Sequence, residues 1–113
     1  MNKKETIKRI YEILTQCGTL TSKPDVLGTY PVEDEVYTKR LDVNKTIGEG
    51  PDTIDIVCVT LSSSDEEFGN SSPSDIRLNT KNTNDQWCNL FITDATDEML
   101  SLVQSALNNK YQI

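Results

Sequence analysis

Two stretches of the chain, one near each end, repeat apolar residues at helical spacing. The first covers residues 3–17, where the apolar positions are Ile7, Ile10, Tyr11, Leu14 and Cys17, with Ile13 beside them. The second covers residues 96–110, with Met99, Leu100, Leu102, Val103, Ala106 and Leu107. A recurrence every three or four positions places apolar side chains on one face of an α-helix. Asn2 is the predicted cap of the first helix, and Asp94 or Thr96 that of the second. Gly18 is predicted to end the first helix in a left-handed conformation.

Between the helices, four stretches have the pattern of β-strands: residues 36–43, 54–61, 75–81 and 86–93. Residues 54–61 read Ile-Asp-Ile-Val-Cys-Val-Thr-Leu and are mostly apolar at both alternating sets of positions. Successive side chains of a strand point to opposite faces, so this strand requires cover on both and is predicted to be central. With helices on one face, the other face would offer Val57, Val59, Trp87 and Phe91, and would need loops or another chain to cover it.

The predicted order of elements is α-β-β-β-β-α. Consecutive strands are joined by loops and not by helices, which favours a mostly antiparallel sheet. The expected fold is therefore α+β, a two-layer α/β sandwich in which a four-stranded sheet carries both terminal helices on one face. At 113 residues the chain is expected to form one globular domain, residues 1–113.

Two long connections interrupt this pattern. Residues 18–35 are punctuated by Pro24, Gly28 and Pro31 and are predicted to be irregular, with Leu20, Val26, Leu27 and Tyr30 held against the core. Residues 62–74 are rich in serine and contain one large apolar residue, Phe68. Loops of this length tend to be disordered or functional. Both alternatives stay open here: plain disorder, or a loop that contacts a partner through Asp65, Glu66, Glu67 and Phe68.

The charge is unevenly distributed along the chain, and this bears on the choice of partner. The formal net charge is −7, and residues 51–113 hold three Lys/Arg against ten Asp/Glu. Such a surface is repelled by nucleic-acid phosphates and by anionic membranes, so neither is expected as a partner. It favours a basic protein partner through electrostatic steering, although the charge also serves solubility alone.

The residue types that carry most catalysis and metal binding are scarce. The chain has no histidine, which excludes Ser-His-Asp and Cys-His catalysis and histidine-ligated metals. The acidic run starting at Asp65 fails the calcium-loop pattern, because Asn70 and Ile76 stand where that loop needs Gly and Glu. Asp55 and Asp94 are the one carboxylate pair weighed for catalysis, and a strand meander would put them at opposite ends of the sheet. No catalytic residue, metal ligand or cofactor is therefore predicted.

Cys17, Cys58 and Cys88 are too widely spaced for a CxxC pair, and each lies among apolar neighbours. They are predicted to be buried free thiols of a protein in the reducing cytoplasm. The charged N-terminus lacks a following apolar run, so no signal peptide is expected.

Three functional hypotheses remain. The first is a small acidic, non-enzymatic protein-binding module (an inhibitor, adaptor or immunity-type factor) that docks on a basic protein. Its predicted contact residues are Asp65, Glu66, Glu67, Phe68 and Trp87, the last being either a core-edge anchor or an interface hot spot. The alternative is a structural or assembly subunit of a phage or other multi-protein particle, with homo-oligomeric contacts. The third is an enzyme that uses carboxylates alone.

Overall fold

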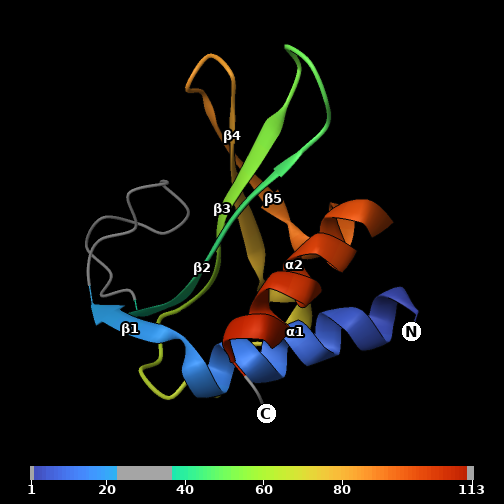
Figure 1. The fold of residues 1–113 in the computed structure, drawn as a ribbon. Helices are drawn as coiled ribbons and strands as arrows, with labels where there is room; N and C mark the ends of the chain where they lie inside the picture. Colours follow the sequence, from blue (N-terminus) through green and yellow to red (C-terminus); the bar gives the residue numbers. More distant parts are fainter. Residues whose placement is uncertain (1, 23–36, 112–113) are drawn as a thin grey trace.

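The computed structural model describes residues 2–22 and 37–111. In chain order its elements are α1 (Lys3–Cys17), β1 (Thr19–Ser22), β2 (Tyr37–Ile47), β3 (Ile54–Ser63), the short 3-10 turn η1 (Pro73–Asp75), β4 (Arg77–Asn82), β5 (Trp87–Phe91), the turn η2 (Ile92–Asp94) and α2 (Asp97–Lys110) (Figure 1). The predicted α+β class is confirmed.

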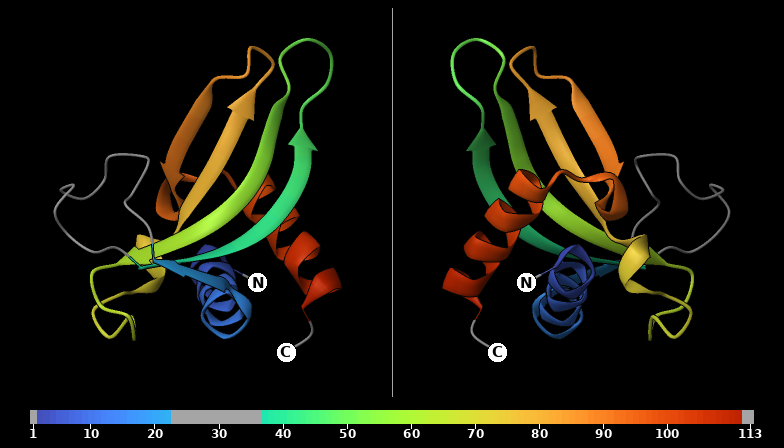
Figure 2. Two further views of the ribbon diagram at one scale, coloured as in Figure 1. Left: turned by 90° about the vertical axis from the view of Figure 1, so that its left-hand side faces the viewer. Right: turned by 90° about the vertical axis from the view of Figure 1, so that its right-hand side faces the viewer.

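The strands form one antiparallel sheet in the order β1-β2-β3-β4-β5, so every strand pairs with its neighbour in the sequence. The terminal helices contact each other and β2, and both lie on the same face of the sheet (Figure 2). We call this face the covered face and the opposite one the open face. The layer arrangement agrees with the prediction, but the sheet has five strands where four were predicted.

The additional strand, β1, lies where the sequence analysis expected irregular chain. Its four residues, Thr-Leu-Thr-Ser, pair with Tyr37–Arg40 of β2. Four residues with a single large apolar side chain are too short a pattern to indicate a strand. Leu20 is exposed and not held against the core as predicted. Val26, Leu27 and Tyr30 lie outside the described residues.

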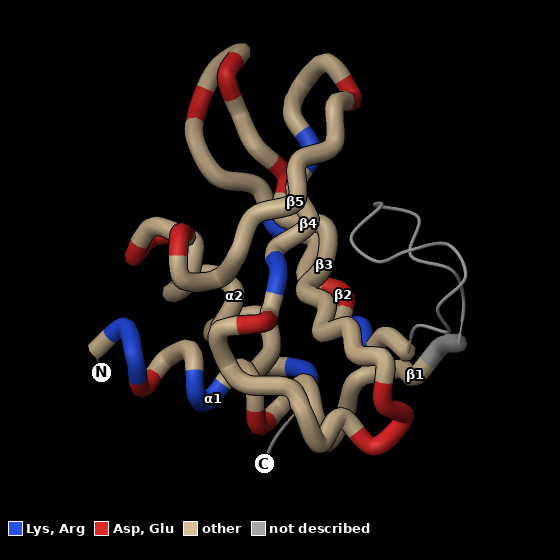
Figure 3. The backbone as a smooth tube through the Cα atoms, turned by 180° about the vertical axis from the view of Figure 1, so that it is seen from behind, with Lys and Arg blue, Asp and Glu red and all other residues tan. Residues whose placement is uncertain are grey.

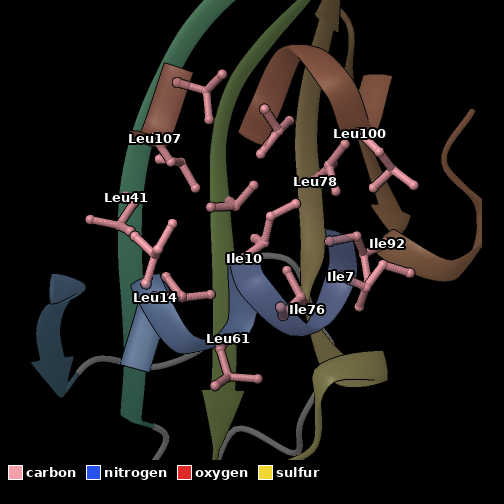
Figure 4. Close-up of a cluster of buried hydrophobic side chains, with 14 of the residues drawn as sticks. Ile7, Ile10, Leu14, Leu41, Leu61, Ile76, Leu78, Ile92, Leu100 and Leu107 are labelled. Carbon is pink, nitrogen blue, oxygen red and sulfur yellow. The ribbon is translucent and has the colours of Figure 1, made fainter. Parts of the chain in front are cut away.

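The core fills the space between the covered face and the two helices (Figure 4). The helical stripes supply Ile7, Ile10, Ile13, Leu14, Leu100, Val103, Ala106 and Leu107, while the sheet supplies Leu41, Val43, Ile56, Val59, Leu61 and Leu78. Full burial of one such side chain contributes about 1.5–3 kcal/mol relative to leaving it exposed. Burying these two stripes together therefore fixes both helices on the same face.

A β-bulge in β3 corrects the prediction that this strand is apolar on both faces. The pairing with β4 skips Val57, since Ile56 pairs with Thr80 and Cys58 pairs with Asn79. One extra residue reverses the alternation beyond it. Val59 and Leu61 therefore join Ile56 in the core, with Val59 0% exposed, and the open face receives Cys58, Thr60 and Ser62 instead.

The predicted helix ends are confirmed in part. The Asn2 Oδ1 atom accepts a hydrogen bond from the Glu5 backbone N–H (2.8 Å), and Thr96, not Asp94, caps α2 by accepting from the Met99 N–H (3.2 Å). Gly18 does follow α1, but its backbone is extended (φ −64°, ψ 141°) because the chain passes directly into β1. A Cβ at Gly18 would lie 3.0 Å from the Lys39 Cβ and press on the Leu14 carbonyl.

Candidate functional site

The described residues contain no group of three or more Cys, Asp or Glu placed to hold a metal ion. The one carboxylate pair weighed from the sequence does not converge. Asp55 begins β3 at the level of Lys81 and Trp87, whereas Asp94 follows the other end of β5. β3 and β5 are both antiparallel to β4, so these two acids lie at opposite ends of the sheet, as the meander predicts.

The three cysteines are free thiols in three different environments. Cys58 is buried, Cys17 is partly buried and Cys88 is exposed, which corrects the prediction that all three are buried. Cys88 points to the covered face, but it lies on a strand whose side chains are mostly exposed. Burial raises the pKa of the Cys58 thiol, and this outweighs the opposing effects of Arg40 and of a hydrogen bond with Asn79. A high thiol pKa disfavours the nucleophilic thiolate.

The acidic loop between β3 and η1 is folded, which corrects the alternative of plain disorder. The Asp65 carboxylate accepts hydrogen bonds from the backbone N–H groups of Glu67 (3.0 Å) and Gly69 (3.0 Å). Ser63 Oγ donates to Asn70 Oδ1 (2.7 Å) and accepts from the Asp65 N–H (2.9 Å). The Asp65 carboxylate thus stabilises the loop, and the side chains of Asp65, Glu66 and Glu67 are all exposed to solvent.

Phe68 is not an exposed contact residue, contrary to its predicted role. Its side chain is 5% exposed and belongs to the core cluster. The Lys39 ammonium lies 5.0 Å from the centre of the Phe68 ring and donates a hydrogen bond to the Thr15 carbonyl near the end of α1 (2.8 Å). Phe68 therefore anchors the acidic loop to the core and leaves Glu66 and Glu67 as its outward-facing part.

Trp87 lies on the open face, where it is 57% exposed, so it is not a core-edge anchor. Phe91, four residues further along the same strand, is 44% exposed on the same face. Each ring has a cation from β4 beside it: Lys81 lies 5.7 Å from the Trp87 ring centre, and Arg77 lies 4.7 Å from that of Phe91. Both cations are the register partners of the aromatic residues. Of the predicted contact residues, Trp87, Asp65, Glu66 and Glu67 are thus exposed, and Phe68 is buried.

A small polar hollow of about 210 Å³ adjoins Phe91 on the open face. It is lined by strand residues Thr60, Ser62, Arg77 and Phe91 and by Asn70, Ser71 and Asp75 from the loop that follows β3. The hollow shows that the acidic loop borders the open face. Sequence analysis missed it because its lining comes from three strands and a loop, and no local motif marks such a site.

A second hollow was also missed. It is an open groove of about 820 Å³ between α1 and residues 72–74, lined mainly by apolar atoms, with Ile7, Tyr11 and Pro73 among them and Lys4 and Lys8 beside them. Lys3 also borders it, and its ammonium donates to the Thr93 carbonyl (2.7 Å). None of the predicted contact residues lines this groove.

Acidic residues lie at both ends of the sheet as well as on the helices, and they do not form a patch on one face (Figure 3). Glu49, Asp52 and Asp85 lie in the two hairpin turns at one end, while Asp65, Glu66 and Glu67 lie in the loop at the other. The open face between them carries Arg40, Arg77 and Lys81, and these cations already have partners. Arg40 pairs with Asp42 (3.0 Å), Lys81 pairs with Asp85 (3.2 Å), and Arg77 stacks on Phe91.

No family model, curated protein or solved structure matches this chain. Neither helix in the described part of the chain is long and apolar enough to cross a membrane.

Proposed function

We propose that this chain is a non-enzymatic protein-binding domain that docks on a basic protein, as an inhibitor, adaptor or immunity-type factor. The observation that carries the proposal is the pair of exposed rings, Trp87 and Phe91, on a sheet face without a helix layer. Tryptophan is enriched among interface hot spots because a large ring buries much apolar area. Two such rings on one short strand form a compact anchor for a partner.

The charge around this anchor supports a basic partner. The open-face cations are engaged with Asp42, Asp85 and the Phe91 ring, whereas Glu66 and Glu67 are exposed in the bordering loop. With a net charge of −7, the long-range field attracts a positively charged protein and accelerates its association. The acidic loop then steers the partner, and the aromatic residues hold it.

We place the domain in the cytoplasm. Three free thiols, one of them exposed, are compatible with a reducing compartment, where exposed thiols stay reduced.

The experiment that tests this proposal is affinity capture from the native host lysate, followed by binding kinetics with the purified partner. Trp87→Ser is expected to weaken binding at least tenfold, since truncation of a hot-spot residue costs 2 kcal/mol or more. Leu20→Ser is the matched control, because Leu20 is also a large exposed apolar residue but lies on β1, at the other edge of the sheet. Equal binding by Trp87→Ser and the parent protein would refute the open-face site.

A charge-reversal experiment tests the role of the acidic loop. The double change Glu66→Lys with Glu67→Lys is expected to slow association and to reduce its dependence on salt, because exposed charges act mainly on the association rate. The same double reversal at Glu5 and Glu98, which lie on the two helices, is the control. A loop variant whose association rate matches that of this control would exclude steering by the loop.

A structural or assembly subunit is the second candidate, and the composition of the edge strand β5 favours it. This strand reads Trp-Cys-Asn-Leu-Phe and contains no charge. Rings or filaments that form at rising protein concentration would support this candidate over the first.

A further inference from the structure

β5 is the last strand of the sheet and pairs only with β4 among the described residues. It lies at the border of the sheet, away from both helices (Figure 2). Natural edge strands are commonly protected by charged residues, proline or a bulge. β5 contains no charged residue or proline, and its register with β4 is continuous from Lys81–Trp87 to Arg77–Phe91. Four of its five side chains are exposed. β5 therefore has the features of an edge strand that pairs with a strand of another molecule.

The hydrogen bonds of the hairpin show which backbone groups are available at this edge. The Asn82 N–H donates to the Gln86 carbonyl (3.0 Å), and the Ile92 N–H donates to the Ile76 carbonyl (2.8 Å). Backbone groups alternate in direction along an antiparallel strand. The backbone N–H and C=O groups therefore point toward β4 at residues 86, 88, 90 and 92. They point away from β4 at Trp87, Asn89 and Phe91.

These three outward positions are symmetric about Asn89, and the side chains around it are self-complementary. Antiparallel pairing of β5 with a second β5 centred on Asn89 sets Trp87 opposite Phe91 of the other copy, twice, on the open face. Cys88 then stands opposite Leu90 on the covered face. Aromatic cross-strand pairs of this kind stabilise antiparallel sheets. The pairing brings no charged side chain of β5 opposite another, because the strand has none.

We propose that two copies of this chain pair through β5 in this register, so that two five-stranded sheets become one continuous sheet. The dimer has a two-fold axis through the Asn89 pair, which is the symmetry expected of a self-complementary surface. The open faces of the two copies then form one continuous surface. The Trp87 and Phe91 rings of both copies lie at its centre. The dimer shares Trp87 and Phe91 with the partner surface proposed above, but the inference rests on the strand edge and not on the acidic loop, and the oligomeric state of the purified protein tests it separately.

Sedimentation velocity over a range of protein concentration, from about 1 μM to about 1 mM, is the first test, since a five-residue strand pair makes a small interface of modest affinity. We expect a shift from the 12.7 kDa chain to a species of twice that mass. The single tryptophan gives a second readout, because its emission should shift to the blue as its ring meets Phe91 of the other copy. A protein that stays monomeric throughout this range would overturn the proposal and leave the edge to a strand of another protein.

Asn89→Pro tests the edge itself. Proline removes the outward N–H of residue 89 and leaves the hydrogen bonds to β4 in place, a position in which edge strands accept proline. We expect the dimer dissociation constant to rise at least tenfold. Asn89→Thr, which keeps the N–H and suits a strand, is the matched control and should dimerise as the parent does. Should circular dichroism show that Asn89→Pro is unfolded, Asn89→Lys makes the same test, because it sets two like charges opposite each other.

The register is tested by cross-linking. In a Cys88→Ser background, Asn89→Cys places two thiols directly opposite each other at about 5.5 Å between Cα atoms, within disulfide range. We expect rapid formation of a covalent dimer under mild oxidation, and slow formation in the parent, where Cys88 faces Leu90. A dimer that survives Asn89→Pro and Asn89→Lys unchanged and fails to cross-link at position 89 would refute the β5 interface.

Discussion

The backbone at Phe68 has φ 58°, in the left-handed region that residues with a Cβ seldom adopt. The ring is nevertheless 5% exposed and in the core. Burial of an aromatic side chain stabilises the fold by more than such a backbone conformation costs. The conformation turns the loop so that one residue faces inward while its neighbours Glu66 and Glu67 face solvent.

Phe68→Ala is expected to reduce the free energy of unfolding by about 3–5 kcal/mol, because it leaves a cavity under the acidic loop. Chemical denaturation followed by circular dichroism measures this loss. Glu66→Gln, on the same loop but exposed, should change stability by less than about 0.5 kcal/mol. If the two variants were equally stable, Phe68 would not be a core residue.

Cys58 has a pKa above the ordinary thiol range, chiefly because its burial disfavours the thiolate. The folded state thus holds this proton more tightly than the unfolded state does. The contribution of this shift to the free energy of unfolding is fully present below the thiol pKa of the unfolded state. It is lost as pH rises from that value through the thiol pKa of the folded state. Between about pH 8 and pH 10, the parent should lose stability more steeply than Cys58→Ala. Denaturant midpoints measured across this range test the difference, and parallel pH profiles would contradict it.

The three thiols should also differ in reactivity toward a disulfide reagent at neutral pH. We expect Cys88, which is exposed, to react first, and Cys58, which is buried with a raised pKa, to react only as the protein unfolds. Mass spectrometry of peptides after timed labelling identifies the order. Labelling of Cys58 at the rate of Cys88 in the folded protein would contradict the described burial.

At the scale of elements, the bulge in β3 decides which side chains face the helices. Two valines of the same strand, Val57 and Val59, would share a face in a regular strand. The bulge leaves Val57 half-buried and sends Val59 fully into the core.

Val59→Ala is expected to cost about 2 kcal/mol of unfolding free energy, and Val57→Ala less than about 1 kcal/mol, from the apolar area each side chain buries. The substitution removes the same atoms at both positions, so each variant controls for the other. Thermal or denaturant unfolding measures both. Equal losses would indicate a strand without the bulge.

At the scale of the whole molecule, the core depends on both ends of the chain. α1 and α2 contact each other and pack on the same sheet face. A chain cut before α2 would expose the apolar side chains of α1 and the sheet that Leu100, Val103 and Leu107 cover.

A chain ending at Thr96 is therefore expected to lose cooperative unfolding. Calorimetry or near-ultraviolet circular dichroism tests this, because both report fixed tertiary packing. The double substitution Ser101→Ala with Ser105→Ala, on the exposed side of α2, is the control and should keep the transition. Cooperative melting of the shortened chain would show that the sheet and α1 form a core by themselves.

The sequence alone determined the helices, four of the five strands, the antiparallel arrangement and the shared helix face. Hydrophobic periodicity carries this information locally, and short connections restrict how neighbouring strands pair. The capping residue Asn2 was likewise identifiable from residue type and position, whereas Thr96 was one of two candidates with Asp94 and only the structure distinguished them.

Trp87, Glu66 and Glu67 were expected from the sequence as contact residues, but the surroundings of the site depend on the tertiary structure. The bulge at Val57 depends on pairing with β4, and the burial of Phe68 depends on a backbone turn and on a neighbour, Lys39, from a distant strand. The exposure of Trp87 depends on whether another segment covers the open face at its edge strand, and the described residues leave the ring 57% exposed there. These are relations between segments far apart in the chain, and local periodicity contains no information about them.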